Sequence, residues 1–460
     1  MRRVDAVRDS ISEIYPAEYI PPASGFDHAK CASLHSNKCS NYGGGLVSSL
    51  RVVEICAGAG GQALGLEQAG FEHALAVELD PTAADTLRLN RPQWKVRTGD
   101  VADPEVWDPA EFQNVDLLAG GVPCPPFSIA GKQLGANDER DLFAWAVELC
   151  GIMRPRALML ENVRGLSAPR FSAYRQHVLD RLSELGYVAD WRLLQASDYG
   201  VPQLRPRFVL VALRKEDAPY FTWPEATPVQ RTVGEELMDL MEANGWKHAK
   251  HWASRANRIA PTIVGGSKKH GGADLGPTRA KAAWREMGVD GLGVADAAPS
   301  ADVGEDHDPK LTVEMVARLQ GWDETEWKFA GRKTSKYRQI GNAFPPPVAR
   351  AIGRQIAAAL RHEGEPRVQT EVITHDEVYR ALRAASDPLT VNEIHQRISG
   401  SLTHEEIEIR LKHLTRDFNM SRIESAAGEP AYKLGDFRAF IGQDDHIRHE
   451  YLAQMRSKVS

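Results

Sequence analysis

The chain has 460 residues, 42% of them hydrophobic and 26% charged, and its formal net charge is −6 at pH 7. This length predicts several domains, and no apolar run reaches the roughly 20 residues that a membrane helix needs. Five cysteines are too few for a disulfide framework, so we expect a cytoplasmic chain with no membrane partner. The negative net charge excludes a general attraction to polyanions such as nucleic acids. A polyanion would instead have to bind a local basic patch.

Residues 1–48 contain several prolines and the glycine run 43–45, which predicts an irregular N-terminal extension. Cys31, His35 and Cys39 recur every four residues within it. Because this spacing is not one of the usual zinc patterns, we favour a solvated segment and predict no metal site.

A glycine-rich turn follows the β-prone run Arg51–Cys56 and precedes a helical pattern at Leu66–Ala69. Glycines at 58 and 60 let the backbone approach a ligand, and a helix N-terminus offers free N–H groups, which suits a nucleotide-like cofactor. The turn departs from the dinucleotide fingerprint, because Ala63 stands at the third glycine position.

Two carboxylates follow at the ends of the next predicted strands. The strand Ala74–Glu78 ends about 20 residues beyond the glycines, where a ribose partner is expected. A helix over Pro81–Asn90 leads to a strand at Lys95–Thr98, which is followed by Asp100. Each acid alone could be an ordinary surface residue. Together with the turn they indicate an adenosine-bearing ligand, and without a lysine-bearing phosphate loop that ligand is not ATP.

The apolar run Val115–Ala119 predicts a buried strand, and Cys124 lies between prolines in the loop just after it. A lone cysteine in an apolar setting is more often inert. Its place at the carboxyl end of a strand favours a nucleophile instead, because open α/β sheets build their sites there. The polar loop 131–138 is a candidate lid.

Three charged side chains stand at the mouths of the strands that follow. Glu161 ends the predicted strand Ala157–Val163, and Arg205 and Arg207 precede the strand Phe208–Leu213. The alternatives for Glu161 are a helix N-cap and a structural hydrogen bond with Asn162, and the alternative for the arginines is a solvated pair. The connecting elements are predicted as a helix at Arg140–Met153, a helix at Phe171–Leu185 and a strand at Tyr187–Leu194.

Five motifs in this order resemble the DNA cytosine-5 methyltransferase family, of the bacterial restriction-modification type. They are Gly58-x-Gly60-Gly61, Pro123-Cys124, Glu161-Asn162-Val163, Gln203-x-Arg205-x-Arg207 and the late block Tyr337–Pro346. The likeness covers about residues 50 to 360. It implies an S-adenosylmethionine-dependent enzyme acting on double-stranded DNA.

The resemblance also implies roles for the catalytic residues. Cys124 would add to carbon 6 of a flipped-out cytosine, because carbon 5 is a poor nucleophile until carbon 6 is attacked. Glu161 would protonate or hydrogen-bond nitrogen 3, and Arg207 would hold oxygen 2 with Arg205 close by.

The residues that the resemblance assigns to S-adenosylmethionine are Cys56, Ala57, Gly58, Gly60, Gly61, Glu78, Leu79, Asp100, Val101, Pro123, Asn342 and Ala343. The chain departs from the family at Cys56, where a phenylalanine is usual, and at Pro125, where glutamine is often found. An aromatic contact to the cofactor is therefore missing or comes from elsewhere.

Residues 215–329 show no clean α/β alternation and resemble the family's target-recognition region. Within 245–285, nine cations stand against one acid, Asp274, which predicts a surface for phosphates and base edges; the alternative is a solvated basic face. The cations are Lys247, Lys250, Arg255, Arg258, Lys268, Lys269, Arg279, Lys281 and Arg285.

Helical patterns at Leu311–Gln320 and Val348–Leu360 return the chain to the catalytic domain, which we place at 49–214 plus 330–361. Beyond a charged linker, 371–440 predicts a small winged-helix-like domain, followed by a tail at 441–460. Its helices are expected at His375–Ala385, Val391–Ile398 and His404–Phe418, with a β-ribbon at Ser421–Leu434. Because the third helix opens with acids, we favour a protein contact over an auxiliary DNA contact.

The predicted fold class is α/β: a Rossmann-like methyltransferase sheet, a loop-rich recognition region and a winged-helix-like C-terminal domain. We expect an S-adenosylmethionine-dependent DNA (cytosine-5) methyltransferase that is monomeric on DNA. The alternatives are an RNA cytosine-5 methyltransferase and a DNA-binding regulator without turnover.

Overall fold

The structure is a computed structural model, which describes residues 49–123, 140–227, 231–265, 272–368, 374–425 and 427–437. Several predictions fall outside these ranges. They concern the N-terminal extension 1–48, Cys124, the loop 131–138, Lys268, Lys269 and the tail 441–460.

A seven-stranded sheet forms the centre of the catalytic part, with the strand order β3-β2-β1-β4-β5-β7-β6. Its strands are β1 (Leu50–Ile55), β2 (Phe71–Glu78), β3 (Val96–Thr98), β4 (Leu117–Gly120), β5 (Ala157–Val163), β6 (Tyr187–Gln195) and β7 (Pro206–Arg214). Neighbouring strands are parallel except that β7 runs antiparallel to both β5 and β6. The sheet is therefore mixed.

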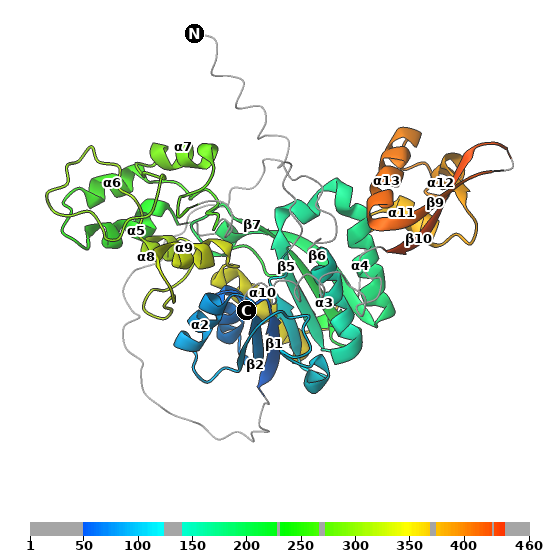
Figure 1. Ribbon diagram of the computed structural model, residues 1–460, viewed down its shortest axis with the longest axis horizontal. Coiled ribbons are helices and arrows are strands. Elements are labelled where there is room, and N and C mark those ends of the chain that lie inside the picture. Colours follow the sequence, from blue (N-terminus) through cyan, green and yellow to red (C-terminus); the bar gives the residue numbers. More distant parts are fainter. Residues whose placement is uncertain are drawn as a thin grey trace, which may run out of the picture. The chain divides into compact units, whose positions relative to one another are not determined.

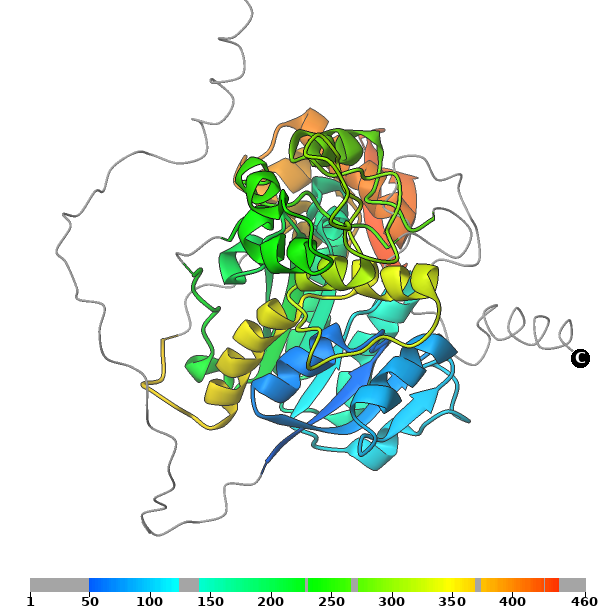
Figure 2. The same ribbon diagram turned by 90° about the vertical axis from the view of Figure 1, so that its left-hand side faces the viewer.

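Helices cover both faces of this sheet (Figure 1). They are α1 (Gly61–Gln68), α2 (Pro81–Asn90), α3 (Arg140–Met153), α4 (Ser172–Glu184) and α10 (Pro346–Leu360). A further helix, α9 (Lys333–Asn342), precedes α10 in the chain. Alternate residues of a strand face opposite sides. On β1, Val53 and Ile55 belong to the core that includes α3 and α4, whereas Val52 belongs to the core that includes α1 and α10. Figure 2 shows the yellow helix α10 lying beside the blue helix α1.

The chain reverses its direction of winding between β1 and β4, which are adjacent strands although β2 and β3 separate them in sequence. In open α/β sheets such a switch point leaves a crevice at the carboxyl ends of the strands. The turn after β1 and the loop after β4 both start at this crevice.

Residues 215–329 are more regular than the sequence indicated. They contain α5 (Val233–Glu242), α6 (Ala249–Arg255), α7 (Thr278–Glu286) and α8 (Val313–Arg318). Only the last was expected. A capping box at Thr232 and Glu235 begins α5, and this signal was present in the sequence. The tryptophans at 246, 252 and 284 are buried in a core that also includes Ala63 and Leu64 of α1.

The C-terminal part has three helices and a three-stranded antiparallel sheet in the order β8-β10-β9. The elements are α11 (Glu377–Arg383), β8 (Leu389–Thr390), α12 (Val391–Arg397), α13 (His404–Asp417), β9 (Phe418–Glu424) and β10 (Pro430–Phe437). The expected ribbon thus starts earlier than Ser421, because β9 follows α13 without a break. Phe418 and Phe437 join this core to Tyr174 of α4.

Two further boundaries differ from the prediction. The helix after the glycine turn begins at Gly61 rather than near Leu66. The block around Tyr337 forms most of α9, which was not expected to be helical. Both segments are rich in glycine and polar residues, which lowers their intrinsic helix propensity, and tertiary packing overrides it.

Candidate active site

The turn after β1 is shaped by two kinds of glycine. Gly58 has φ +55°, and a Cβ there would have no neighbour within 4 Å, so that its surface is open. Gly60 and Gly61 are closed in by protein: a Cβ on Gly60 would lie 2.6 Å from Trp327 Cζ2, and one on Gly61 would lie 2.2 Å from the Phe344 carbonyl oxygen. Gly58 therefore offers the space for a ligand, and the other two allow close packing.

Aromatic packing supports the turn from the protein side. The indole N–H of Trp327 donates to the Ala59 carbonyl at 3.0 Å, and Trp327 is 1% exposed. Trp327 was not singled out from the sequence, because it lies 268 positions away from Ala59. Cys56, where the family usually has phenylalanine, is half-buried with φ 51°.

Glu78 lies at the carboxyl end of β2 and contacts the turn directly. Its Oε2 accepts the Gly58 N–H at 2.7 Å and its Oε1 accepts the Asp80 N–H at 2.8 Å. Burial raises the pKa of the Glu78 carboxyl, and these backbone donors act to lower it. Each oxygen keeps a lone pair, so that the carboxylate can accept hydroxyl groups as well.

The other predicted cofactor residues lie along the same edge. Leu79 follows Glu78 and is 61% exposed, which is unusual for a leucine next to a buried strand. Asp100 is buried and accepts the Ala102 N–H at 3.0 Å. Val101 is buried in the core, and its carbonyl accepts the Trp107 indole N–H at 2.7 Å.

The strand β4 leads to the predicted nucleophile. Val122 is buried and Pro123 is exposed, and Cys124 lies outside the described residues. The Asn162 side chain donates to the Val122 carbonyl at 3.2 Å. A Cβ on Gly121 would lie 3.5 Å from Glu161 Oε2. The end of β5 is thus held against the chain just before Cys124.

Glu161 and Arg207 form a buried ion pair at this edge. Arg207 Nε lies 2.6 Å from Glu161 Oε1, although its N–H is not aligned for a hydrogen bond. The two residues are 8% and 7% exposed. The pairing of β5 with β7 sets Val163 opposite Arg207, which brings the two side chains together. Asn162, the partner in the alternative interpretation of Glu161, donates to the Val122 carbonyl instead.

Burial shifts the protonation of both members of the pair. It raises the pKa of the Glu161 carboxyl, while the charges of Arg207 and Arg205 act to lower it. Burial also lowers the pKa of the Arg207 guanidinium, which Glu161 opposes. A carboxyl in such a setting holds a proton more readily than one in water.

Arg205 has different partners from Arg207. It is 1% exposed, and its guanidinium donates to the carbonyls of Ile263 at 2.6 Å, Gly341 at 2.7 Å and Ala343 at 2.9 Å. Its hydrogen bonds therefore join three segments that are far apart in sequence.

Buried amides extend this junction. Gln203 donates to the Leu319 carbonyl at 3.1 Å and to Gln320 Oε1 at 2.8 Å, and it accepts the Ile263 N–H at 2.9 Å. Gln320 in turn donates to the Ile340 carbonyl at 2.8 Å. Gln320 was missed from the sequence, because no local pattern shows that a glutamine at a helix end is buried.

Asn342 and Ala343 lie at the centre of this junction. A Cβ on Gly265 would lie 2.5 Å from Asn342 Oδ1, and a Cβ on Gly61 would lie 3.1 Å from Ala343 Cβ. The block therefore touches the glycine turn on one side and the recognition region on the other.

The matches to known proteins agree with this arrangement. Residues 50–358 match the family described as C-5 cytosine-specific DNA methylase. The chain belongs to this family. It is a DNA (cytosine-5) methyltransferase, which methylates carbon 5 of cytosine in DNA, and its family uses S-adenosylmethionine as the methyl donor.

Three relatives of this methyltransferase are type II methyltransferases. M.NaeI of Lentzea aerocolonigenes is 64% identical over 414 residues, which cover 90% of this chain and 100% of that protein. M.NgoMIV of Neisseria gonorrhoeae is 51% identical over 315 residues, covering 68% and 98%. M.Eco47II of Escherichia coli is 35% identical over 338 residues, covering 67% and 79%.

Residues 245–285 of the methyltransferase are less basic in the structure than their composition indicated. Arg258 pairs with Glu286 at 2.8 Å and Arg255 with Asp308 at 3.1 Å, and both acids lie outside 245–285. Lys281 pairs with Asp274 at 2.8 Å. The count of nine cations against one acid therefore overstates the local charge.

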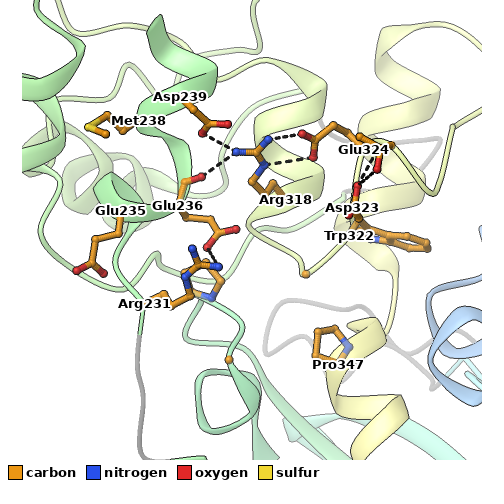
Figure 3. A pocket seen from close by; sticks show the side chains of 14 residues that line it. Arg231, Glu235, Glu236, Met238, Asp239, Arg318, Trp322, Asp323, Glu324 and Pro347 are labelled. Carbon is orange, nitrogen blue, oxygen red and sulfur yellow. Dashed lines mark hydrogen bonds and ion pairs between the residues drawn. The ribbon is translucent and has the colours of Figure 1, made fainter. Parts of the chain in front are cut away.

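A pocket of about 610 Å³ lies between α5 and the chain around Trp322 (Figure 3). Arg318 lies at its centre and contacts Asp239 at 2.6 Å, Glu324, and the Glu236 carbonyl at 3.2 Å. Arg231 pairs with Glu236 at 2.9 Å. None of the predicted site residues lines the pocket. Its excess of carboxylates disfavours phosphate, so we assign its ion pairs to holding α5 against α8.

Among the residues that the structure describes, no helix is long and apolar enough to span a membrane.

Proposed function

We propose that the methyltransferase acts on a flipped-out cytosine in a specific double-stranded DNA sequence, through a transient covalent bond between Cys124 and carbon 6. The observation that carries this proposal is the buried Glu161–Arg207 pair. It lies against Gly121, three residues before Cys124, at the edge where the sheet's crevice opens. A stacked base cannot reach such a recessed pair, so the cytosine must leave the helix.

The chain's own residues account for activation of the ring. Addition of the Cys124 thiolate to carbon 6 forms the S–C bond and moves electron density to carbon 5. Protonated Glu161 donates to nitrogen 3, and Arg207 donates to oxygen 2, so that both stabilise the charge that develops on the ring. Once carbon 5 has taken its methyl group, loss of the carbon-5 proton to a base lets the ring expel the thiolate and restores the carbon 5–carbon 6 double bond. S-adenosylmethionine, when bound, supplies the methyl group that carbon 5 takes.

The residues at the crevice fit an adenosine-bearing methyl donor. The open surface of Gly58, the carboxylate of Glu78 and the exposed Leu79 form a site for backbone approach, ribose hydroxyls and an apolar ring. We also assign Asp100 to this site. The remaining proposed cofactor residues are Cys56, Ala57, Gly60, Gly61, Val101, Pro123, Asn342 and Ala343.

We assign Arg205 to positioning rather than to chemistry, because three carbonyls occupy its guanidinium. It would set the distance between the recognition region and the Glu161–Arg207 pair. The type II relatives support a restriction-modification role for the chain, in which 215–329 selects the DNA sequence.

Expression in a bacterial host that lacks cytosine methylation tests the proposal. Bisulfite sequencing of the host DNA should show one methylated sequence for the wild type and none for Cys124→Ala. Methylation of cellular RNA alone would favour the RNA alternative. Sequence-specific DNA binding without methylation by the wild type would favour a regulator, and full methylation by Cys124→Ala would rule out the covalent mechanism.

A further inference from the structure

The C-terminal part docks on the helix that follows the catalytic Glu161. Asp376 Oδ2 accepts the Ser172 hydroxyl of α4 at 2.6 Å, and the His375 N–H donates to Gln176 Oε1 at 2.8 Å. His177 of α4 contacts the Tyr379 hydroxyl at 2.9 Å and stacks on Phe437 with ring centroids 4.6 Å apart. This contact is buried and specific, so the C-terminal part has a fixed place on the catalytic domain.

Cations gather where the two parts meet. Arg410, His413 and Arg416 follow one another at three-residue intervals along α13. Arg170 lies in the short 3-10 helix Pro169–Phe171, against which α13 packs. Burial and the charges of Arg416, Arg410 and Arg170 lower the pKa of His413, and the charge of Asp376 acts to raise it. The junction thus carries an excess of positive charge.

Arg410 and Arg175 at this junction are bound to acceptors within the protein. Arg410 contacts Asp376 at 3.1 Å and the Ser172 hydroxyl. Arg175 of α4 donates to the carbonyls of Leu166 at 2.7 Å and Ala168 at 2.9 Å. Arg170 and Arg416 are exposed. Arg170 lies 3.9 Å from the centroid of the Phe171 ring, and Arg416 has no ion pair among the described residues.

The junction also lies next to the reacting edge of the sheet. The chain passes from Glu161 at the end of β5 through two 3-10 helices, Arg164–Ser167 and Pro169–Phe171, before α4 begins. A duplex held at this edge extends beyond the target base pair on both sides, so its backbone can reach past β5.

We propose that Arg170 and Arg416 form a second DNA contact, which binds the sugar-phosphate backbone flanking the methylated site. Exposed arginines can bind backbone phosphates without contacting the edges of the bases, so this contact does not depend on the DNA sequence. This revises the expectation of a protein contact, which rested on the acids that open α13. Glu406 instead belongs to a capping box with Thr403 at the start of that helix, and Arg416 lies at its other end.

A relative supports an accessory role for this module. The alignment with M.NgoMIV spans 315 residues and 98% of that protein but 68% of this chain. The family match in this chain ends at residue 358. M.NgoMIV is therefore long enough for the family segment but too short for an additional C-terminal domain. We infer that the family segment suffices for the reaction and that a DNA contact from the C-terminal part of this chain adds affinity.

The double variant Arg170→Gln/Arg416→Gln tests the contact, using a duplex that contains the mapped target and extends by roughly one helical turn on each side. Between about 50 and 200 mM salt, the slope of log affinity against log salt should fall by about two, because two phosphate contacts are lost. Affinity at physiological salt should fall about tenfold, and kcat at saturating DNA should stay within about twofold.

The double variant Arg354→Gln/Arg397→Gln is the matched control, because it removes the same charge from exposed positions on α10 and α12. It should keep the wild-type slope. A short duplex that ends just beyond the target should bind the wild type and the Arg170→Gln/Arg416→Gln variant equally. An unchanged slope for that variant, or an equal loss in the control, would overturn the inference.

This inference rests on the proposed function only in using DNA as the probe. If the wild type binds DNA but does not methylate it, the proposed mechanism is refuted. The salt dependence of DNA affinity can still be compared between the wild type and the two double variants.

Discussion

Glu161 and Arg207 are ionisable groups in a place where the protein excludes most water. Taking both from water costs more than a surface pair would, and their attraction at 2.6 Å only partly repays that cost. Such a pair is therefore poorly explained as a stabilising contact. It is better explained as a pair of hydrogen-bond donors that is preorganised to bind a cytosine ring. A preorganised site does not have to reorient its dipoles during the reaction, and this lowers the barrier.

The pH dependence of the reaction tests the protonated state of Glu161. Because its pKa is raised, the carboxyl stays protonated to higher pH than an exposed one, and activity should fall as pH rises through that pKa. The Arg207 charge lowers the same pKa. Arg207→Gln should therefore shift the alkaline limb of kcat/KM to higher pH, on top of a general loss of rate.

The exposed Arg192→Gln on β6 is the control, since it should leave the limb in place. If the ionised form of Glu161 were the active one, activity would instead rise with pH through its pKa, and Arg207→Gln would move an acid limb of kcat/KM to higher pH.

At the scale of elements, α1 and α10 are held in close contact by a glycine. A Cβ on Gly65 would lie 2.4 Å from the Pro346 carbonyl oxygen and 2.7 Å from the Arg350 N, both of them backbone atoms that cannot move aside easily. Because α1 starts at the glycine turn and α10 starts at the block after Asn342, this contact aligns two sides of the cofactor crevice.

Two glycine-to-alanine changes in helices should have opposite effects. Gly65→Ala should destabilise the protein by about 2 to 3 kcal/mol, because α1 and α10 must separate. Gly151→Ala on α3 should stabilise it by up to about 1 kcal/mol, because alanine is the better helix former.

Urea unfolding measures both changes. A Cβ on Gly151 meets only Leu185 Cδ2, at 3.4 Å, which is the flexible end of a side chain. If the two substitutions change the free energy of unfolding equally, the close backbone contact between α1 and α10 is not the reason for glycine at position 65.

At the scale of the whole molecule, Asp376 couples the C-terminal part to the catalytic domain. It is 4% exposed, accepts the Tyr379 N–H at 2.9 Å at the start of α11, and contacts both Ser172 and Arg410. A single carboxylate thus caps one helix and joins two domains. Its removal would leave the Arg410 charge without a partner.

Asp376→Ala should therefore lower the free energy of unfolding by about 3 kcal/mol. Hydrogen exchange should accelerate in α11 and α4 together, because the contact between them is lost. Asp387→Ala, at an exposed position in the same module, should change stability by less than about 0.5 kcal/mol. Faster exchange in α11 alone would mean that Asp376 is only a helix cap.

Most elements of the catalytic domain could be predicted from the sequence, because their signals are local. The helices Pro81–Asn90 and Arg140–Met153 and the strand Ala157–Val163 have the predicted bounds. Within residues 215–329 the helices α5, α6 and α7 were missed, since the tryptophans in their core do not follow a simple period. Their burial is decided by neighbours distant in sequence.

The sequence alone determined the order of the motifs, and with it the family and the edge of the sheet where the site lies. Only the tertiary structure decided how the site residues are paired. The reversed direction of β7 brings Arg207 to Glu161, and contacts with Ile263, Gly341 and Ala343 give Arg205 a different task. Strand direction and the burial of a charge depend on contacts between distant segments, which no local pattern of residues records.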